Sequence, residues 1–173
     1  EHYLPAFQDA TGRQRAEVKA ISGSESAPTF ANTVEALDRT GELLDRVSGV
    51  FFGLLSAETN DRHQATAKEV APMLSALQDD ILLDPALFKR VKSVWDARES
   101  LDLTPEQRTL AKKTFRDFVR GGANLDDKRK ERLRAVNAEL SVLGVKFGEN
   151  VLEDTKAYKL VIEKREDLAG LPA

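Results

Sequence analysis

Cysteine is absent from the sequence, and histidine occurs only twice, at His2 and His63. Without cysteine the chain can form neither disulfides nor thiolate metal sites, and it has no cysteine nucleophile. The two histidines lie far apart, so the H-E-x-x-H pattern that holds a catalytic zinc on one helix is missing. These absences remove several of the residues that hydrolytic and metal chemistry uses most.

Long apolar runs and an excess of one charge are missing as well. No stretch approaches the roughly 18 apolar residues that cross a bilayer, and Glu1–Pro5 has neither the basic nor the apolar region of a secretion signal. The formal net charge is -3, with both signs mixed along the chain, so no broad positive surface is expected. We therefore expect neither nucleic-acid nor membrane partners. A cytoplasmic location is expected, with the periplasm left open.

The residues that are present predict one all-α domain, or one lobe of a larger protein, over 1–173. Hydrophobic residues make up 41% of the sequence, enough for a single core. Apolar residues recur at spacings of three and four, which is typical of helices buried along one side. The pattern predicts an array of about six helices, at residues 4–22, 29–58, 61–83, 85–98, 105–121 and 126–155.

Capping residues and glycines mark several of these helix ends. Asp84-Pro85 combines a cap with a first-turn proline, and Thr104 with Gln107 satisfies the capping-box pattern. Gly121-Gly122 can close the preceding helix, because glycine adopts the left-handed conformation without strain. Pro72 lies inside the predicted helix 61–83 and predicts a kink there.

The last helix and the segment after it have two further features. Near-heptad apolar spacing predicts one long helix with an apolar stripe, formed by Leu133, Val136, Leu140, Leu143, Phe147 and Val151. The aromatic residues on helical apolar faces are expected in the core, namely Phe51, Phe52, Phe115, Phe118 and Phe147. Residues 158–162 predict one short strand. Because that strand has no partner, we expect the natural protein to continue beyond Ala173.

Four groups of residues have the composition of candidate sites, and none is assigned a catalytic, cofactor-binding or metal-binding role. His63 lies among polar residues of the kind that cap helices, and Asp79-Asp80 is typical of a solvated carboxylate pair. Gly121-Gly122 follows a helix and lacks the lysine of a phosphate loop. The basic run Lys128–Arg134 is interrupted by acidic residues, which favours a solvated helix face.

Several stretches together resemble one family, the zinc peptidases related to thimet oligopeptidase and oligopeptidase A, and in particular its peptidyl-dipeptidases. They occur in one consistent order over essentially the whole chain. The stretches are Tyr3–Phe7, Ala27–Thr33, Arg46–Phe52, Ser56–Asp61, Val70–Pro72, Pro85–Val91, Phe118–Leu125, Arg132–Asn137 and Phe147–Leu152.

The resemblance implies the N-terminal lobe of a neurolysin-like, two-lobed enzyme that removes dipeptides from the C-termini of short peptides. Its zinc, the H-E-x-x-H ligands and the catalytic lobe would all lie beyond Ala173, so the chain alone would be inactive and metal-free. The resemblance implies a noncatalytic role, walling the substrate channel, with the catalytic lobe as partner. It also implies that some apolar helix face is exposed in this chain, through which the chain could self-associate.

Two other hypotheses remain open from the residues alone. Long capped helices with a heptad-like stripe at 133–151 also suit a free-standing helical interaction module. Nucleic-acid binding through Lys128–Arg134 would show a steep dependence on salt. Metal content and peptidase activity discriminate the first hypothesis from the zinc peptidase.

Overall fold

A computed structural model describes residues 2–170 and confirms the predicted all-α class. Its elements are α1 (Tyr3–Ser22), the π-helix η1 (Phe30–Glu35), α2 (Ala36–Asp38), α3 (Glu42–Ala57), α4 (Asp61–Leu82), α5 (Pro85–Ala97), α6 (Pro105–Arg120), α7 (Asp127–Ala157) and the 3-10 helix η2 (Arg165–Leu168). Apart from the predicted helix 29–58, every predicted helix agrees with one of these within two residues at each end.

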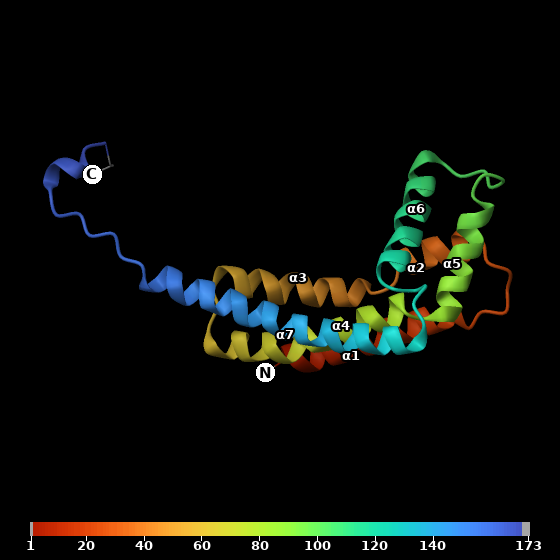
Figure 1. Ribbon diagram of the computed structural model, residues 1–173, viewed down its shortest axis with the longest axis horizontal. Coiled ribbons are helices and arrows are strands. Elements are labelled where there is room, and N and C mark those ends of the chain that lie inside the picture. Colours follow the sequence, from red (N-terminus) through yellow and green to blue (C-terminus); the bar gives the residue numbers. More distant parts are fainter. Residues whose placement is uncertain (1, 171–173) are drawn as a thin grey trace.

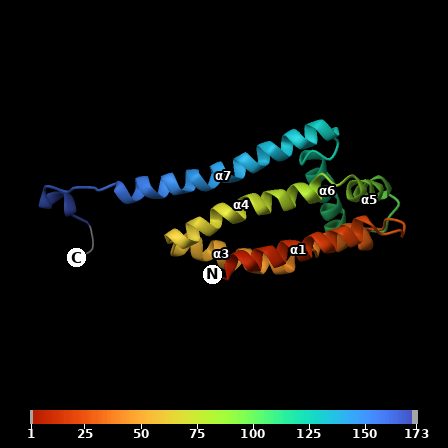
Figure 2. The same ribbon diagram turned by 90° about the horizontal axis from the view of Figure 1, so that it is seen from below.

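Four long helices, α1, α3, α4 and α7, run side by side along the molecule, and α2, α5 and α6 gather at one end (Figure 1). α4 packs against α1 on one side and against α7 on the other (Figure 2), while α3 packs on α1. α5 and α6 pack against each other and against η1. Residues 158–170 lead away from the far end of α7 (Figure 1). No helix among residues 2–170 is long and apolar enough to cross a membrane.

The core consists of three apolar clusters. Phe7, Phe51 and Val70 are fully buried where α1, α3 and α4 meet, and the Phe7 and Phe51 rings meet edge to face at 5.4 Å. A second cluster joins α1, α5 and the end of α6, and a third joins η1, α5 and α6. Burial of such large side chains is the main favourable term in folding, and each contributes about 1.5–3 kcal/mol.

The prediction of one unbroken helix over 29–58 is wrong. Thr29 and Asn32 form a capping box that starts η1, and the helix then ends at a turn before Gly41. Gly41 has φ +84°, a left-handed conformation that favours glycine. Its N–H donates a hydrogen bond of 2.8 Å to the Glu17 carboxylate on α1. The break therefore depends on a contact with another helix, which apolar spacing does not report.

The predicted strand at 158–162 is not formed in the described chain. These residues are extended coil and exposed, with Tyr158 the first of them at φ -66° and ψ 129°. An isolated strand leaves its backbone groups without partners and is not stable alone. The β-branched residues therefore favour an extended backbone here, but only pairing with a second strand could stabilise it as a strand. The helix α4 runs unbroken through Pro72, and the kink there stays a prediction.

The apolar stripe of α7 is half-buried at Leu133 and Val136 and exposed at Leu140, Leu143, Phe147 and Val151. None of the α7 residues, all of which lie in the described chain, is buried. Phe147 is 70% exposed, and Phe52 on α3 is exposed as well, so these two aromatic residues lie outside the core. Phe51 and Phe118 are buried as expected, and Phe115 stacks on Trp95.

Candidate functional site

His63 lies in the first turn of α4, where its contacts stabilise the fold. Its backbone N–H donates to the side chain of Asn60, the residue that caps α4, at 3.0 Å. Its ring packs edge-on against Tyr3 and Phe51, with centroid distances of 5.9 and 6.1 Å. His63 thus contributes to the packing of α1, α3 and α4. His2 lies just before α1 and is exposed.

The Asp79-Asp80 pair connects three helices. Asp79 is buried and accepts a hydrogen bond of 2.6 Å from the Asn137 side chain of α7. Asp80 lies between two arginines, Arg15 of α1 at 3.1 Å and Arg134 of α7 at 2.9 Å. The two carboxylates therefore point to different partners, as neighbouring helix positions do. Their contacts fix α1 and α7 on opposite sides of α4.

The two glycines after α6 close that helix, as predicted. Gly122 has φ +97°, and the N–H of Ala123 donates to the Phe118 carbonyl at 3.0 Å. This is the Schellman pattern of a helix C-terminus. A side chain at Gly122 would meet Leu133 at 2.7 Å, so the turn also brings α7 close to the end of α6.

Three residues of the basic run Lys128–Arg134 form hydrogen bonds or ion pairs within the protein. Arg134 pairs with Asp80, and the Lys130 ammonium donates to the Leu83 carbonyl at 3.2 Å. Arg129 pairs with Asp126, the residue that caps α7. These contacts position the start of α7 against the end of α4.

Among residues 2–170, no group of three histidine, aspartate or glutamate side chains could hold a metal ion. Glu106 has a pKa lowered from its ordinary value, because its own backbone N–H and then the Thr104 hydroxyl donate to it. Glu106 lies in the first turn of α6 and is fully exposed. The hydrogen bonds that lower its pKa are those of the capped start of α6, and they do not indicate a catalytic site.

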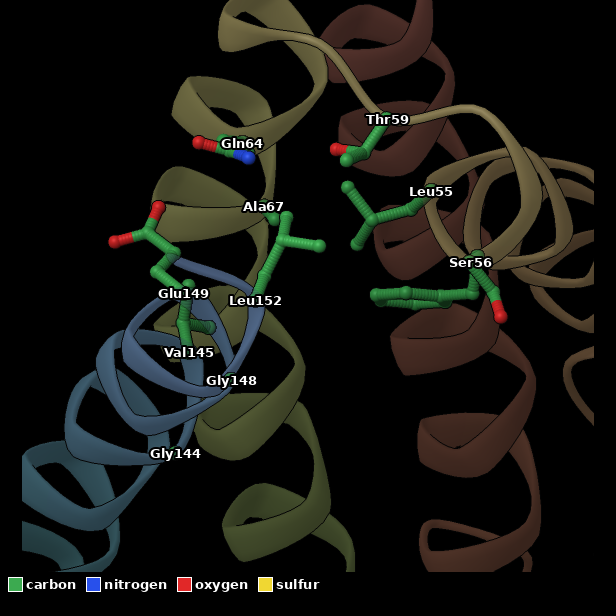
Figure 3. A pocket seen from close by; sticks show the side chains of 11 residues that line it. Leu55, Ser56, Thr59, Gln64, Ala67, Gly144, Val145, Gly148, Glu149 and Leu152 are labelled. Carbon is green, nitrogen blue, oxygen red and sulfur yellow. The ribbon is translucent and has the colours of Figure 1, made fainter. Parts of the chain in front are cut away.

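A groove lies between α3, α4 and the C-terminal half of α7. Its volume is about 390 Å³, and Figure 3 shows Leu55 of α3 and Leu152 of α7 pointing toward one another across it. The lining is mainly apolar and includes Phe52, Leu55, Ala67, Val145 and Leu152. A concave apolar surface of this kind suits the binding of another apolar segment.

Two glycines of α7 form part of the groove wall. Gly144 and Gly148 are one helical turn apart, and a Cβ atom added to either would meet nothing within 4 Å. Their backbone is therefore open to close approach by another chain segment. Glycine in a helix interior costs about 0.5–1 kcal/mol relative to alanine. The groove thus includes two positions that weaken α7 without improving its packing within residues 2–170.

Two polar oxygens in the groove lining are buried and accept no hydrogen bond from any described residue, Thr59 Oγ1 and Glu149 Oε1. The Lys68 ammonium lies 2.9 Å from the Glu149 oxygen and compensates its charge, although the pair lacks hydrogen-bond geometry. Buried oxygens without a donor are costly. The groove therefore offers acceptors for donors on a bound segment.

Sequence analysis did not identify this groove. Its residues come from three helices, and apolar spacing assigned several of them to the core. The Gly144-x-x-x-Gly148 spacing was the available signal, because two small residues on one helix face permit close approach by a neighbour.

Known proteins resemble the chain over nearly its whole length, although no protein-family profile matches it. It is 40% identical to the dipeptidyl carboxypeptidase of Salmonella typhimurium and 39% identical to that of Escherichia coli, over 98% of the chain in both comparisons. Identity to oligopeptidase A of Escherichia coli is 23%, over 99% of the chain. In each comparison the chain spans 25% of the relative's length.

These relatives occur in the order that the resemblance predicts, with dipeptidyl carboxypeptidases more similar than oligopeptidase A. The alignments cover the helices, the turn at Gly41 and the α7 groove together, since only a few residues remain outside them. The chain is homologous to the N-terminal part of thimet oligopeptidase-like peptidases.

Proposed function

We propose that the chain is the noncatalytic helical portion of a zinc peptidase that removes dipeptides from the C-termini of short peptides. The observation that supports this most strongly is the 40% identity to a dipeptidyl carboxypeptidase, over 98% of the chain but only 25% of that protein. The chemistry would then reside in the other three quarters. This chain would contribute shape and support.

The contacts of the candidate residues favour a structural role. Asp79 and Asp80 are engaged with Asn137, Arg15 and Arg134 on neighbouring helices. His63 packs against two aromatic rings at the start of α4. The polar side chains that are candidates for chemistry thus fix the helices relative to one another.

The residues of this chain do not fit a zinc site by themselves. Catalytic zinc needs three protein ligands around one open position, whereas His2 and His63 precede or begin different helices and no acidic cluster joins them among residues 2–170. In the whole enzyme zinc would polarise the peptide carbonyl and activate a water molecule. We assign its ligands to the part of the peptidase outside this chain.

A wall of rigid helices explains how such a region contributes without catalytic side chains. α1, α4 and α7 lie side by side and are cross-linked through Asp79 and Asp80. A wall of this kind would admit short extended peptides to a channel and exclude folded proteins by size. The proposal extends to this exclusion and to short peptides as the substrates of the whole enzyme.

The test compares the chain with the complete protein encoded by its gene. We expect the complete protein to contain about one zinc ion per molecule by elemental analysis and to release dipeptides from a short peptide, detected by mass spectrometry. Residues 1–173 alone should bind no stoichiometric zinc and release nothing. Dipeptide release by the chain alone, or a zinc-free complete protein without peptidase activity, would contradict the proposal. A specific protein partner of such an inactive protein would instead support an interaction module.

A further inference from the structure

Most of the exposed large apolar side chains belong to α3, to α7 and to the segment that follows α7. On α3 they are Val50, Phe52 and Leu54, and on α7 they are Leu140, Val142, Leu143, Phe147 and Val151. Others follow in the segment 158–168. α5 has none among its described residues, and α6 has Val119. This distribution marks the end of the molecule where α3, the second half of α7 and the tail lie (Figure 1).

The α7 groove lies between α3 and α7, the two helices that carry most of these side chains. Phe52 belongs both to the exposed set and to the groove lining, so apolar surface continues from α3 into the groove and on to Leu152. Gly144 and Gly148 allow close approach by a backbone. Exposed apolar side chains that border a groove favour an interaction site over ordinary solvent-exposed surface.

We propose that this surface, formed by α3, the groove and residues 140–152 of α7, is the docking face for the remaining polypeptide of the same peptidase. The inference rests on the proposed function. The docked segment would place apolar side chains between α3 and α7, with its backbone against Gly144 and Gly148. It would also supply a hydrogen-bond donor to Thr59 Oγ1 or Glu149 Oε1, which accept none from residues 2–170.

The length of the relatives favours the remaining polypeptide over a second copy of this chain. The chain spans 25% of each dipeptidyl carboxypeptidase, so three quarters of such a protein is available to cover the surface. A second copy paired through α7 alone would cover Leu143 and Phe147 but leave α3 exposed. One large neighbouring lobe covers α3, the groove and α7 together and satisfies the groove oxygens.

The experiment measures thiol labelling of single-cysteine variants, which the absence of native cysteine in this chain makes possible. Val151→Cys places a thiol on the proposed face, where the native side chain is 48% exposed. Val119→Cys is the matched control on α6, where the native valine is 38% exposed. Each variant is prepared as residues 1–173 and as the complete protein, with any cysteines of the remaining polypeptide replaced by serine.

We expect both variants to label quickly in the 173-residue chain. In the complete protein, labelling of Val151→Cys should slow by at least about tenfold, because access would require undocking, while Val119→Cys should label as before. Equal labelling of Val151→Cys in both proteins would overturn the docking face. Protection of Val151→Cys within the 173-residue chain that disappears on dilution would overturn it too, in favour of a second copy.

The failure of this inference can be separated from failure of the proposed function. The complete Val151→Cys protein is assayed in parallel for zinc content and dipeptide release. An active zinc protein with an unprotected thiol would retain the proposed function and reject the docking face. A protected thiol in a zinc-free, inactive protein would do the reverse.

Discussion

Filling the groove from α7 should have opposite effects on the chain and on the complete peptidase. We consider Gly148→Ala and Gly148→Leu, which add side chains of increasing size to the groove wall. A Cβ at Gly148 meets nothing within 4 Å, and the groove that Gly148 lines has a volume of about 390 Å³, so the described chain leaves room for either side chain. Any loss of stability must therefore come from what docks there.

In the 173-residue chain both substitutions should increase the free energy of unfolding. Replacing a helix-interior glycine by a good helix former contributes about 0.5–1 kcal/mol. For a domain of this size, each 1 kcal/mol raises Tm by about 2–4 °C. Scanning calorimetry of the chain should therefore show a rise of about 1–4 °C for either variant.

In the complete protein, Gly148→Leu should destabilise instead, by about 1–3 kcal/mol, as overpacking of a filled site does. Urea unfolding measures this difference, and Gly148→Ala should be intermediate. Gly12→Leu is the matched control, because Gly12 lies in mid-helix on α1 and also has open space around it. If Gly148→Leu stabilises the complete protein as much as Gly12→Leu does, the groove is open there and our reasoning is refuted.

Three further substitutions test the fold. Arg90→Met removes three hydrogen bonds that a buried guanidinium donates, two to carbonyls of the loop before η1 and one to the Asn32 side chain within η1. Urea unfolding should show a loss of about 2–3 kcal/mol; no loss would show that the loop is held otherwise. Gly41→Ala forces an alanine to φ +84°, with its Cβ 2.6 Å from the flexible Gln14 side chain, and should lower stability by about 1–2 kcal/mol. Thr104→Ala should cost about 1 kcal/mol of unfolding free energy and move the Glu106 pKa part of the way back up, measured by NMR titration; the backbone N–H keeps the rest of that shift. Stability that depends on ionised Glu106 is lost as pH falls from the unfolded-state pKa through the lowered folded-state pKa, so in Thr104→Ala this loss should be smaller and should end at a higher pH.

Helix positions were predictable because local signals and the structure agree. Thr104 and Gln107 cap α6 as their spacing predicts, and Asp84 accepts hydrogen bonds from two backbone N–H groups at the start of α5. These interactions occur within four residues of sequence, so they form whatever surrounds the helix. The closing turn at Gly122 is local in the same sense.

The break at Gly41 was not predictable from spacing. Val34 of η1 and Leu44 of α3 are both buried, and apolar residues recur between them as in one helix. The turn depends on Glu17, which is 24 residues earlier in the sequence and accepts the hydrogen bond of the Gly41 N–H. The glycine at position 41 permits a turn, but the residue that stabilises the turn lies on α1, far away in the sequence.

The α7 stripe shows a second limit of apolar spacing, which does not report whether an apolar face is covered. Heptad-like spacing correctly identifies Leu143 and Phe147 as one apolar face of a long helix, yet α7 packs on α4 through a different face that includes Arg134 and Asn137. Periodicity reports that a face is apolar, whereas burial requires a neighbour that covers it. A sequence that maintains such a face, and two glycines beside it, is consistent with a chain whose folding is completed by another part of a larger peptidase.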